Sequence, residues 1–391
     1  MLQRKITVDY THRILFTRDA FAPDNTVVRD LVSLDRVGKP AKALVFIDSR
    51  VALALPGLVR QVAEYAAAHL DVLHLAAEPL VIPGGEACKN DFRLVEQCWR
   101  AVNEAALDRH SYIFVIGGGA VLDMVCFAAS TAHRGVRHVR FPTTTLSQGD
   151  GGVGVKNGVN YFGKKNWVGS FAVPFAVVND FSYLETLPER ERRNGIIEAI
   201  KVALIRDAKF FAEICQRADE LAALDQKALE RVVQRSAELH VEHIAGNGDP
   251  FEMGSARPLD FGHWAAHKLE QVSGFRVAHG EAVAVGIAID LIYSVKRAII
   301  DAATAERIIS LIERIGFATY APELLQRSSN GELVILAGLE EFREHLGGEL
   351  NVTLVPEIGR KIEVHEMDRA LIVAALEHLR DRSEAGVAQT R

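Results

Sequence analysis

The chain lacks the features that mark secreted, membrane and nucleic-acid-binding proteins. Its four cysteines include no C-x-x-C pair, which argues against a disulfide framework and favours reduced thiols in a cytoplasmic protein. No apolar run approaches the roughly 18 residues that a membrane span requires, and residues 1–8 contain no apolar signal core. Acidic residues (51) outnumber basic ones (45), so the net charge of −6 argues against nucleic acid as a partner.

What is present is an ordinary globular composition, 49% hydrophobic and 25% charged, in a chain of 391 residues that is long enough for two domains. In residues 1–185, short apolar runs alternate with helical patterns. Strands are expected at 43–48, 72–75, 79–82, 112–116 and 138–141, and helices at 55–69 and 91–107. This alternation predicts an N-terminal α/β domain, with a parallel sheet covered by helices on both faces.

Residues 186–391 show a different pattern, in which apolar residues recur mostly at helical spacing. Helices are expected at 192–204, 209–224, 227–244, 258–272, 281–295, 302–315 and 368–379, with strands only at 350–355 and 361–364. The last residues, 383–391, are expected to form a frayed tail. We therefore predict a second, mainly α-helical domain.

A glycine cluster in the first domain has the position of a dinucleotide-binding turn. Gly117-Gly-Gly119 directly follows the strand expected at 112–116 and precedes a helix that carries Asp123. Glycines at such a turn let the backbone approach a pyrophosphate, and the helix N-terminus favours its charge. The spacing is not G-x-G-x-x-G, and a purely structural turn is the alternative. Asp48, at the end of a strand, could accept hydrogen bonds from a ribose or could serve only the turn.

A second polar segment combines glycines with cations and amides. A hydroxyl-rich loop ends at Asp150 and runs into a glycine-rich stretch with Lys156, and Lys165 and Asn166 follow. Backbone N–H groups beside point charges suit a bound phosphate. A flexible surface hairpin is the alternative, and Arg134 could add a further phosphate contact.

Four residues of the second domain form a candidate metal site. His263 and His267 are four residues apart, so a helix would place both on one face, and His279 follows a short break. Glu198 lies in a strongly apolar stretch, where an unpaired carboxylate is costly. Two imidazoles and a carboxylate leave an open coordination position, as catalytic zinc needs. The alternatives are hydrogen-bonded core histidines and a plain Glu198–Lys201 ion pair on a helix.

Taken in order, these motifs resemble those of the sugar phosphate cyclases, the superfamily of dehydroquinate synthase, over roughly residues 40–370. The resemblance implies a dinucleotide domain followed by a helical metal domain, an active site between them and a homodimer. It implies zinc, or alternatively cobalt, on Glu198, His263 and His279. It implies NAD contacts from Asp48, Glu86, Lys89, Gly118, Gly119, Asp123, Thr143 and Thr144. The substrate and its phosphate would meet Asp150, Lys156, Lys165, Asn166, Arg134 and Lys201, and His267 would lie next to the metal as an acid/base or positioning group.

The departures from that pattern concern the substrate. Dehydroquinate synthases carry Asp-Ser-Ser-Val-Gly-Gly-Lys-Thr-Gly, where this chain has Asp-Gly-Gly-Val-Gly-Val-Lys-Asn-Gly at 150–158. Their arginine before the metal helix falls on Ala256, with Arg257 one place off, and Glu344-His345 replaces an acid followed by lysine. Two cations that would meet a substrate carboxylate are therefore missing, which favours an uncharged sugar. The segments 249–252, 255–264 and 341–348 resemble those of the 2-epi-5-epi-valiolone synthases, which act on sedoheptulose 7-phosphate.

The resemblance thus implies a phosphorus–oxygen lyase that forms a C7 cyclitol by transient NAD oxidation, phosphate elimination, reduction and an intramolecular aldol step. Four alternatives stay open: 3-dehydroquinate synthase, another C7 cyclitol synthase (of 2-epi-valiolone or desmethyl-4-deoxygadusol), a metal-dependent NAD polyol dehydrogenase, and an inactive NAD-binding regulator. We expect Ala266 and His345 to influence the stereochemistry of the product.

Overall fold

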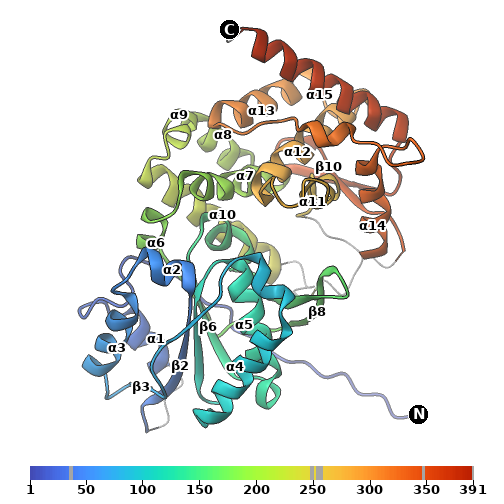
Figure 1. The fold of residues 1–391 in the computed structure, drawn as a ribbon. Coiled ribbons are helices and arrows are strands. Elements are labelled where there is room, and N and C mark those ends of the chain that lie inside the picture. The colour runs from blue at the N-terminus through green and yellow to red at the C-terminus, as the bar shows by residue number, and fades with distance from the viewer. Residues whose placement is uncertain (35–37, 247–250, 252–258, 346–347, 390–391) are drawn as a thin grey trace. The chain divides into compact units, whose positions relative to one another are not determined.

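The computed structural model describes residues 1–34, 38–246, 251, 259–345 and 348–389 (Figure 1). The chain forms two compact units, Met1–Leu187 and Pro188–Arg391, and each is considered by itself below. The missing-cation prediction at Ala256 and Arg257 lies outside the described residues. Among the described helices, none is both long and apolar enough to cross a membrane.

The first unit is built on a seven-stranded parallel sheet with the order β1-β9-β6-β5-β2-β3, and β4 also pairs with β2. The strands are β1 (Ile14–Thr17), β2 (Ala41–Asp48), β3 (Leu73–Leu75), β4 (Leu80–Ile82), β5 (Tyr112–Gly117), β6 (Arg137–Pro142) and β9 (Ala176–Asp180). The helices are α1 (Val27–Ser33), α2 (Ser49–Ala54), α3 (Leu58–Ala68), α4 (Phe92–Glu104), α5 (Gly119–Thr131) and α6 (Ser182–Glu185), with short turns η1 (Glu86–Asn90), η2 (Ala132–Arg134) and η3 (Ser147–Gly151).

The sheet has a hydrophobic core on each face because its strands are apolar throughout. Successive side chains of a strand point to opposite faces. In β2, Val45 and Ile47 therefore pack with α1 and α3, whereas Leu44 and Phe46 pack with α4 and α5. Figure 1 shows these two helix pairs on opposite sides of the sheet. Burial on both faces is what a parallel sheet requires.

One antiparallel hairpin, β7 (Lys156–Tyr161) with β8 (Lys164–Phe171), lies outside this sheet. It contains most of the glycine- and lysine-rich segment. The segment forms the hairpin that was the alternative to a phosphate-binding loop, and Asn166 of this hairpin contacts Lys89.

The second unit consists mainly of helices. They are α7 (Glu189–Arg206), α8 (Ala208–Gln216), α9 (Ala218–Ala222), α10 (Gln226–Gly246), α11 (His263–Val272), α12 (His279–Lys296), α13 (Ala302–Ile315), α14 (Ala337–His345) and α15 (Arg369–Gln389), with turns η4 (Pro322–Leu325) and η5 (Val334–Leu336). The strands β10 (Val352–Glu357) and β11 (Arg360–Val364) form a separate hairpin. Nearly every residue from Gly280 to Ser294 is buried, so α12 is a central helix of this unit.

The predicted fold class is confirmed, with corrections at the level of elements. The stretch 209–224 forms two helices, α8 and α9, and the helix predicted at 258–272 begins at His263. The predicted frayed tail is wrong up to Gln389, since α15 continues that far. The strands β1 and β9 and the helix α1 were not predicted from the sequence.

Candidate active site

Three helices of the second unit bring the predicted metal ligands together. Glu198 lies in the middle of α7, His263 is the first residue of α11, and His279 is the first residue of α12. Glu198 Oε1 lies 3.3 Å from His279 Nε2 and 3.8 Å from His263 Nε2. Placing both histidines at helix starts aims their side chains at one point on a third helix.

The geometry of these groups fits a small divalent cation. The three candidate ligand atoms lie within 4.8 Å of one another. Two ligands of one tetrahedral zinc ion are about 3.4 Å apart when each is about 2.1 Å from the metal. Within the described part of the chain, neither oxygen of the buried Glu198 receives a hydrogen bond of good geometry. A buried carboxylate in that condition is stabilised by a cation.

Lys201 is the nearest cation that the chain itself provides. Its Nζ lies 2.5 Å from Glu198 Oε2, and both side chains are almost completely buried. Burial works to raise the pKa of Glu198, but Lys201, His279 and His263 together hold it well below its usual value. Glu198 is therefore a carboxylate, the form that binds a metal. The predicted alternative of a surface Glu198–Lys201 pair is wrong, because the pair is buried.

His267 stands one helical turn beyond His263 and completes the imidazole cluster. The ring centroid of His267 is 5.4 Å from that of His263 and 6.0 Å from that of His279. Burial, reinforced by the two neighbouring imidazoles, lowers the pKa of His267 to about 3. His267 is therefore neutral near pH 7.

Glu270 is a member of this cluster that the sequence analysis missed. Its Oε2 lies 3.2 Å from His279 Nδ1, the ring nitrogen on the side away from Glu198. Burial works to lower the pKa of His279, but the two carboxylates outweigh it and raise this pKa to about 9. A carboxylate behind a ligating histidine orients its ring and raises its basicity. The signal was present in the sequence, because Glu270 follows His267 by three residues on one helix.

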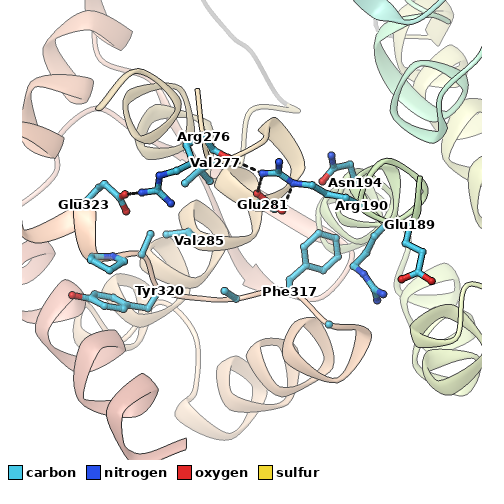
Figure 2. Close-up of a pocket in the computed structure, with 15 residues that line it drawn as sticks. Glu189, Arg190, Asn194, Arg276, Val277, Glu281, Val285, Phe317, Tyr320 and Glu323 are labelled. Carbon is cyan, nitrogen blue, oxygen red and sulfur yellow. Dashed lines mark hydrogen bonds and ion pairs between the residues drawn. The ribbon is translucent and has the colours of Figure 1, made fainter. Parts of the chain in front are cut away.

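The start of α12 is held by an ion pair beside a cavity of about 460 Å³ in the same unit (Figure 2). Arg190 donates two hydrogen bonds to Glu281, at 2.7 and 2.5 Å, and one to the Arg276 carbonyl at 2.7 Å. Glu281 in turn accepts a hydrogen bond from the Ala278 amide at 2.9 Å. None of the candidate metal ligands lines this cavity. The Arg190–Glu281 ion pair on the wall of this cavity therefore fixes the backbone that leads into His279.

In the first unit, the predicted dinucleotide residues gather at the carboxyl ends of β2, β5 and β6. Gly118 is the N-cap of α5 and Gly119 is its first residue, as the glycine cluster in the sequence predicted. The Thr143 amide donates to the Gly117 carbonyl at 3.1 Å, and Thr144 Oγ1 lies 2.8 Å from Ser147 Oγ. Asp48 caps α2, and burial raises its pKa despite hydrogen bonds from the backbone of Arg50 and Gly118. This edge of a parallel sheet is where such folds bind nucleotides.

A buried lysine connects this edge to the hairpin. Lys89 Nζ lies 2.6 Å from Asp123 Oδ2 and also donates to Asn166 Oδ1 on β8. Burial works to lower the pKa of Lys89, but Asp123 and Glu86 raise it. Asn160 donates to Glu86 at 3.3 Å. The structure thus brings together Glu86, Lys89, Asp123 and Asn166, which come from both predicted groups.

The other predicted phosphate residues are spread over the same unit. Asp150 lies on η3, Lys156 begins β7, and Lys165 lies near the start of β8. Arg134 is exposed on η2, where its φ of 64° is in the left-handed region. No contact joins Arg134 to the other predicted residues in the ranges that the structure describes.

Comparison with known proteins identifies the family. Residues 79–194 match the family model of the 3-dehydroquinate synthase N-terminal domain, and residues 195–331 match that of its C-terminal domain. The chain is 34% identical to a 2-epi-5-epi-valiolone synthase of Streptomyces glaucescens over 90% of each chain. It is 32% identical to a 3-dehydroquinate synthase of Nitrosococcus oceani over 76% of this chain and 81% of that one.

A solved structure agrees over nearly the whole length. The 2-epi-5-epi-valiolone synthase ValA of Streptomyces hygroscopicus subsp. jinggangensis 5008, determined with NAD+ and Zn2+ bound, superposes with a TM-score of 0.83 at 26% identity. The match covers 97% of this chain and all of ValA. The chain belongs to the 3-dehydroquinate synthase family of sugar phosphate cyclases, which are phosphorus–oxygen lyases.

Proposed function

We propose that this chain is a 2-epi-5-epi-valiolone synthase, which cyclises sedoheptulose 7-phosphate and releases phosphate. The observation that carries the cyclase chemistry is the group of Glu198, His263 and His279, with Lys201 and His267 beside it. The choice of substrate is supported by the similarity to named 2-epi-5-epi-valiolone synthases over 90% or more of the chain.

The proposal includes NAD and a zinc ion, with cobalt as an alternative. Glu198, His263 and His279 would hold the metal, and Asp48, Gly118, Gly119, Asp123, Thr143, Thr144, Glu86 and Lys89 would hold the dinucleotide. When bound, these groups would supply reversible oxidation of one ring carbinol and polarisation of its oxygen.

The protein side chains would carry the proton and phosphate steps. His267, whose ring lies beside those of His263 and His279, would act as an acid/base or positioning group near the polarised oxygen. Lys201 would donate a hydrogen bond to a substrate oxygen once a metal takes over the charge of Glu198. Lys156, Lys165, Asn166 and Arg134 would stabilise the negative charge on the departing phosphate, and Asp150 would position a substrate hydroxyl.

The residues that differ from dehydroquinate synthases support an uncharged sugar tail. Glu344 and His345, at the end of α14, stand where a lysine would follow an acid. Without that cation, a substrate carboxylate would lack a partner. The homologues named 3-dehydroquinate synthase keep that enzyme as the second candidate, at 32% and 39% identity.

The test is to incubate the purified protein with NAD and zinc against two substrates, sedoheptulose 7-phosphate and the corresponding heptulosonate phosphate. We expect phosphate release only with the first, and a cyclitol of the expected configuration by NMR. Turnover of the heptulosonate phosphate alone would instead identify a dehydroquinate synthase. Net accumulation of NADH would identify a polyol dehydrogenase, because a cyclase regenerates NAD in each cycle.

A homodimer is also proposed, and light scattering at the same protein concentration would test it.

A further inference from the structure

We propose that Arg140, on β6, is a positioning residue for the glycine-rich segment 150–157, and that it acts through the backbone of Lys156. The inference rests on the proposed function in one respect, since that function assigns phosphate to this segment.

Arg140 is a completely buried cation whose partners are mostly backbone oxygens. Its Nη1 donates to the carbonyls of Gly152 and Gly154, both at 2.9 Å, and its Nη2 donates to the Lys156 carbonyl at 2.9 Å. In the described part of the chain, no carboxylate lies within ion-pair distance of it. Burying a charge is costly unless its hydrogen bonds are made. The guanidinium and this segment therefore depend on each other.

The bonded carbonyls belong to Gly152, Gly154 and Lys156, so the turn at 152–155 and the start of β7 present three oxygens to one guanidinium. Three oxygens that bond a buried guanidinium face the interior. They cannot face an anion on the exposed side of the segment, where they would repel it. Arg140 thus orients the segment so that exposed Lys156 stands in front of a buried positive charge.

Asn157 extends the same network to the hairpin. Its Oδ1 accepts from Arg140 Nη2 at 2.6 Å, and its Nδ2 donates to the carbonyls of Val155 and Ser170, both at 3.3 Å. Asn157 stands where the dehydroquinate synthase motif has threonine, whose hydroxyl could not make both kinds of contact at this reach. Arg140 and Asn157 therefore act as one unit.

The packing around Gly152 leaves the segment little freedom to adjust. A Cβ at this position would lie 2.4 Å from the Ser147 carbonyl oxygen on η3, the element that carries Asp150. A change in the Arg140 contacts is therefore transmitted along the segment and is not absorbed locally.

The experiment compares Arg140→Lys and Asn157→Thr with the wild type, using the full chain with NAD and zinc. Lysine keeps the charge but has all its donors on one nitrogen, which cannot occupy the two positions from which Nη1 and Nη2 bond the segment. Arg137→Lys is the matched control, because Arg137 lies on the same strand and contacts Tyr112 instead. The readouts are the dissociation constant of inorganic phosphate by calorimetry, that of NAD, and KM and kcat for sedoheptulose 7-phosphate.

We expect both variants to weaken phosphate binding and raise KM by about tenfold or more, with NAD binding changed by less than about twofold. The control should match the wild type in every readout. If folded Arg140→Lys and Asn157→Thr bind phosphate as the wild type does, Arg140 only supports the fold and the inference is wrong. Should Arg140→Lys not fold, Asn157→Thr alone decides between these outcomes.

The same data separate this inference from the proposed function. If the wild type turns over no heptulose phosphate but the variants still weaken phosphate binding, the function is wrong and the inference stands. If the wild type turns over substrate but binds no inorganic phosphate, and KM is unchanged in the variants, the inference is overturned and the function stands.

Discussion

At the scale of single residues, His279 has a carboxylate on each side of its ring. Glu198 faces Nε2 and Glu270 faces Nδ1, at 3.3 and 3.2 Å. Only one ring nitrogen can bind a metal that Glu198 also binds, so Glu270 is left to fix the ring from behind. Glu270 therefore orients the His279 ring in addition to neutralising its charge.

We expect Glu270→Gln to lower zinc affinity roughly 10- to 100-fold, the usual loss when the partner of a ligating histidine is changed. The amide keeps the shape of the side chain but removes the charge behind the ring. Competition with a chelating dye would measure the dissociation constant. Glu341→Gln is the control, since Glu341 of α14 contacts Lys268 of α11, the helix of Glu270, and has no hydrogen bond or ion pair to a histidine among the described residues. Equal zinc affinity in both variants would rule out this role.

Removing a ligand itself should have a larger effect. His263→Ala and His279→Ala are expected to abolish turnover and to lower bound zinc well below about one ion per chain. His240→Ala, on α10 of the same unit, should retain both. Elemental analysis of the purified proteins measures the metal content. Undiminished zinc in both ligand variants would contradict the assignment.

The histidines could be predicted from sequence because their spacing is a local property of helices. Glu270 has the same helical spacing from His267 and was overlooked, whereas Arg140 could not be assigned a role in this way. Arg140 acquires its role only when β6 brings it beneath a segment that begins ten residues later, and a lone arginine in a strand gives no sign of its partners. Residues that act through three-dimensional contacts are therefore the ones that sequence reasoning misses.

At the scale of elements, the junction of α11 and α12 sets the position of His263. Gly262, with a φ of 78°, immediately precedes α11, and a Cβ there would lie 2.6 Å from the Ile287 amide nitrogen of α12. Asp290 of α12 accepts hydrogen bonds from the Gly262 amide at 3.0 Å and from Trp264 Nε1 at 2.8 Å. The two residues that flank His263 are thus tied to one completely buried carboxyl group.

Above pH 7, where Asp290 is a carboxylate that accepts both hydrogen bonds, Asp290→Asn should destabilise the protein by roughly 1–3 kcal/mol, because the amide can accept only one of them well and its NH₂ would face the other donor. Denaturant unfolding of the metal-free protein at about pH 8 measures this difference. A second comparison, Asp290→Ala, removes both contacts and should cost at least as much. Stability equal to that of the wild type would show that the clamp contributes nothing.

The pH dependence of that difference has a definite sign. Burial raises the pKa of Asp290 from 3.8 to about 7, against the hydrogen bonds from Trp264 and Gly262 that lower it. Between these values the folded chain holds a proton that the unfolded chain has lost, so the free energy of unfolding falls as pH rises. The contribution is complete below about pH 4 and is lost as pH passes 7, by at most about 1.4 kcal/mol per unit.

Urea unfolding of the wild type and of Asp290→Asn would test this, with both proteins freed of metal by a chelator and measured at several pH values between 4.5 and 8.5. The stability difference between them should shrink up to about pH 7 and then level off. Since other groups titrate alike in both proteins, the difference isolates Asp290. A difference that grows with pH would mean that the carboxylate, not the neutral acid, is the stable form in the folded chain.

Long, strongly periodic elements were predictable, whereas short ones that depend on distant partners were not. The central strands β2 and β5 were predicted from their continuous apolar runs. In contrast, β1 has only four residues and pairs with β9 more than 150 residues away. Such a strand is stable only because its partner is in place, and its own sequence carries little signal.

At the scale of the whole molecule, each unit has its own hydrophobic core and its own part of the proposed cofactor site. The candidate metal ligands all belong to Pro188–Arg391, and the candidate dinucleotide residues all belong to Met1–Leu187. A ligand stabilises the folded state that binds it, so each cofactor should protect chiefly the unit that holds it. A division of this kind can be measured without any assay of activity.

Zinc removal should therefore increase hydrogen exchange in peptides from α7, α11 and α12, while peptides from β2 and β5 change little. At a free zinc concentration about 100 times the dissociation constant, the stabilisation is about 2.7 kcal/mol, or roughly a hundredfold slower exchange by unfolding. Adding NAD should slow exchange in peptides from β2 and β5 and change peptides from α7, α11 and α12 little. Mass spectrometry resolves the two sets of peptides in one experiment, and His263→Ala serves as the control that should no longer respond to zinc. Equal deprotection of both units on chelation would mean that the chain unfolds as one cooperative body, and the assignment of each cofactor to one unit would lose this support.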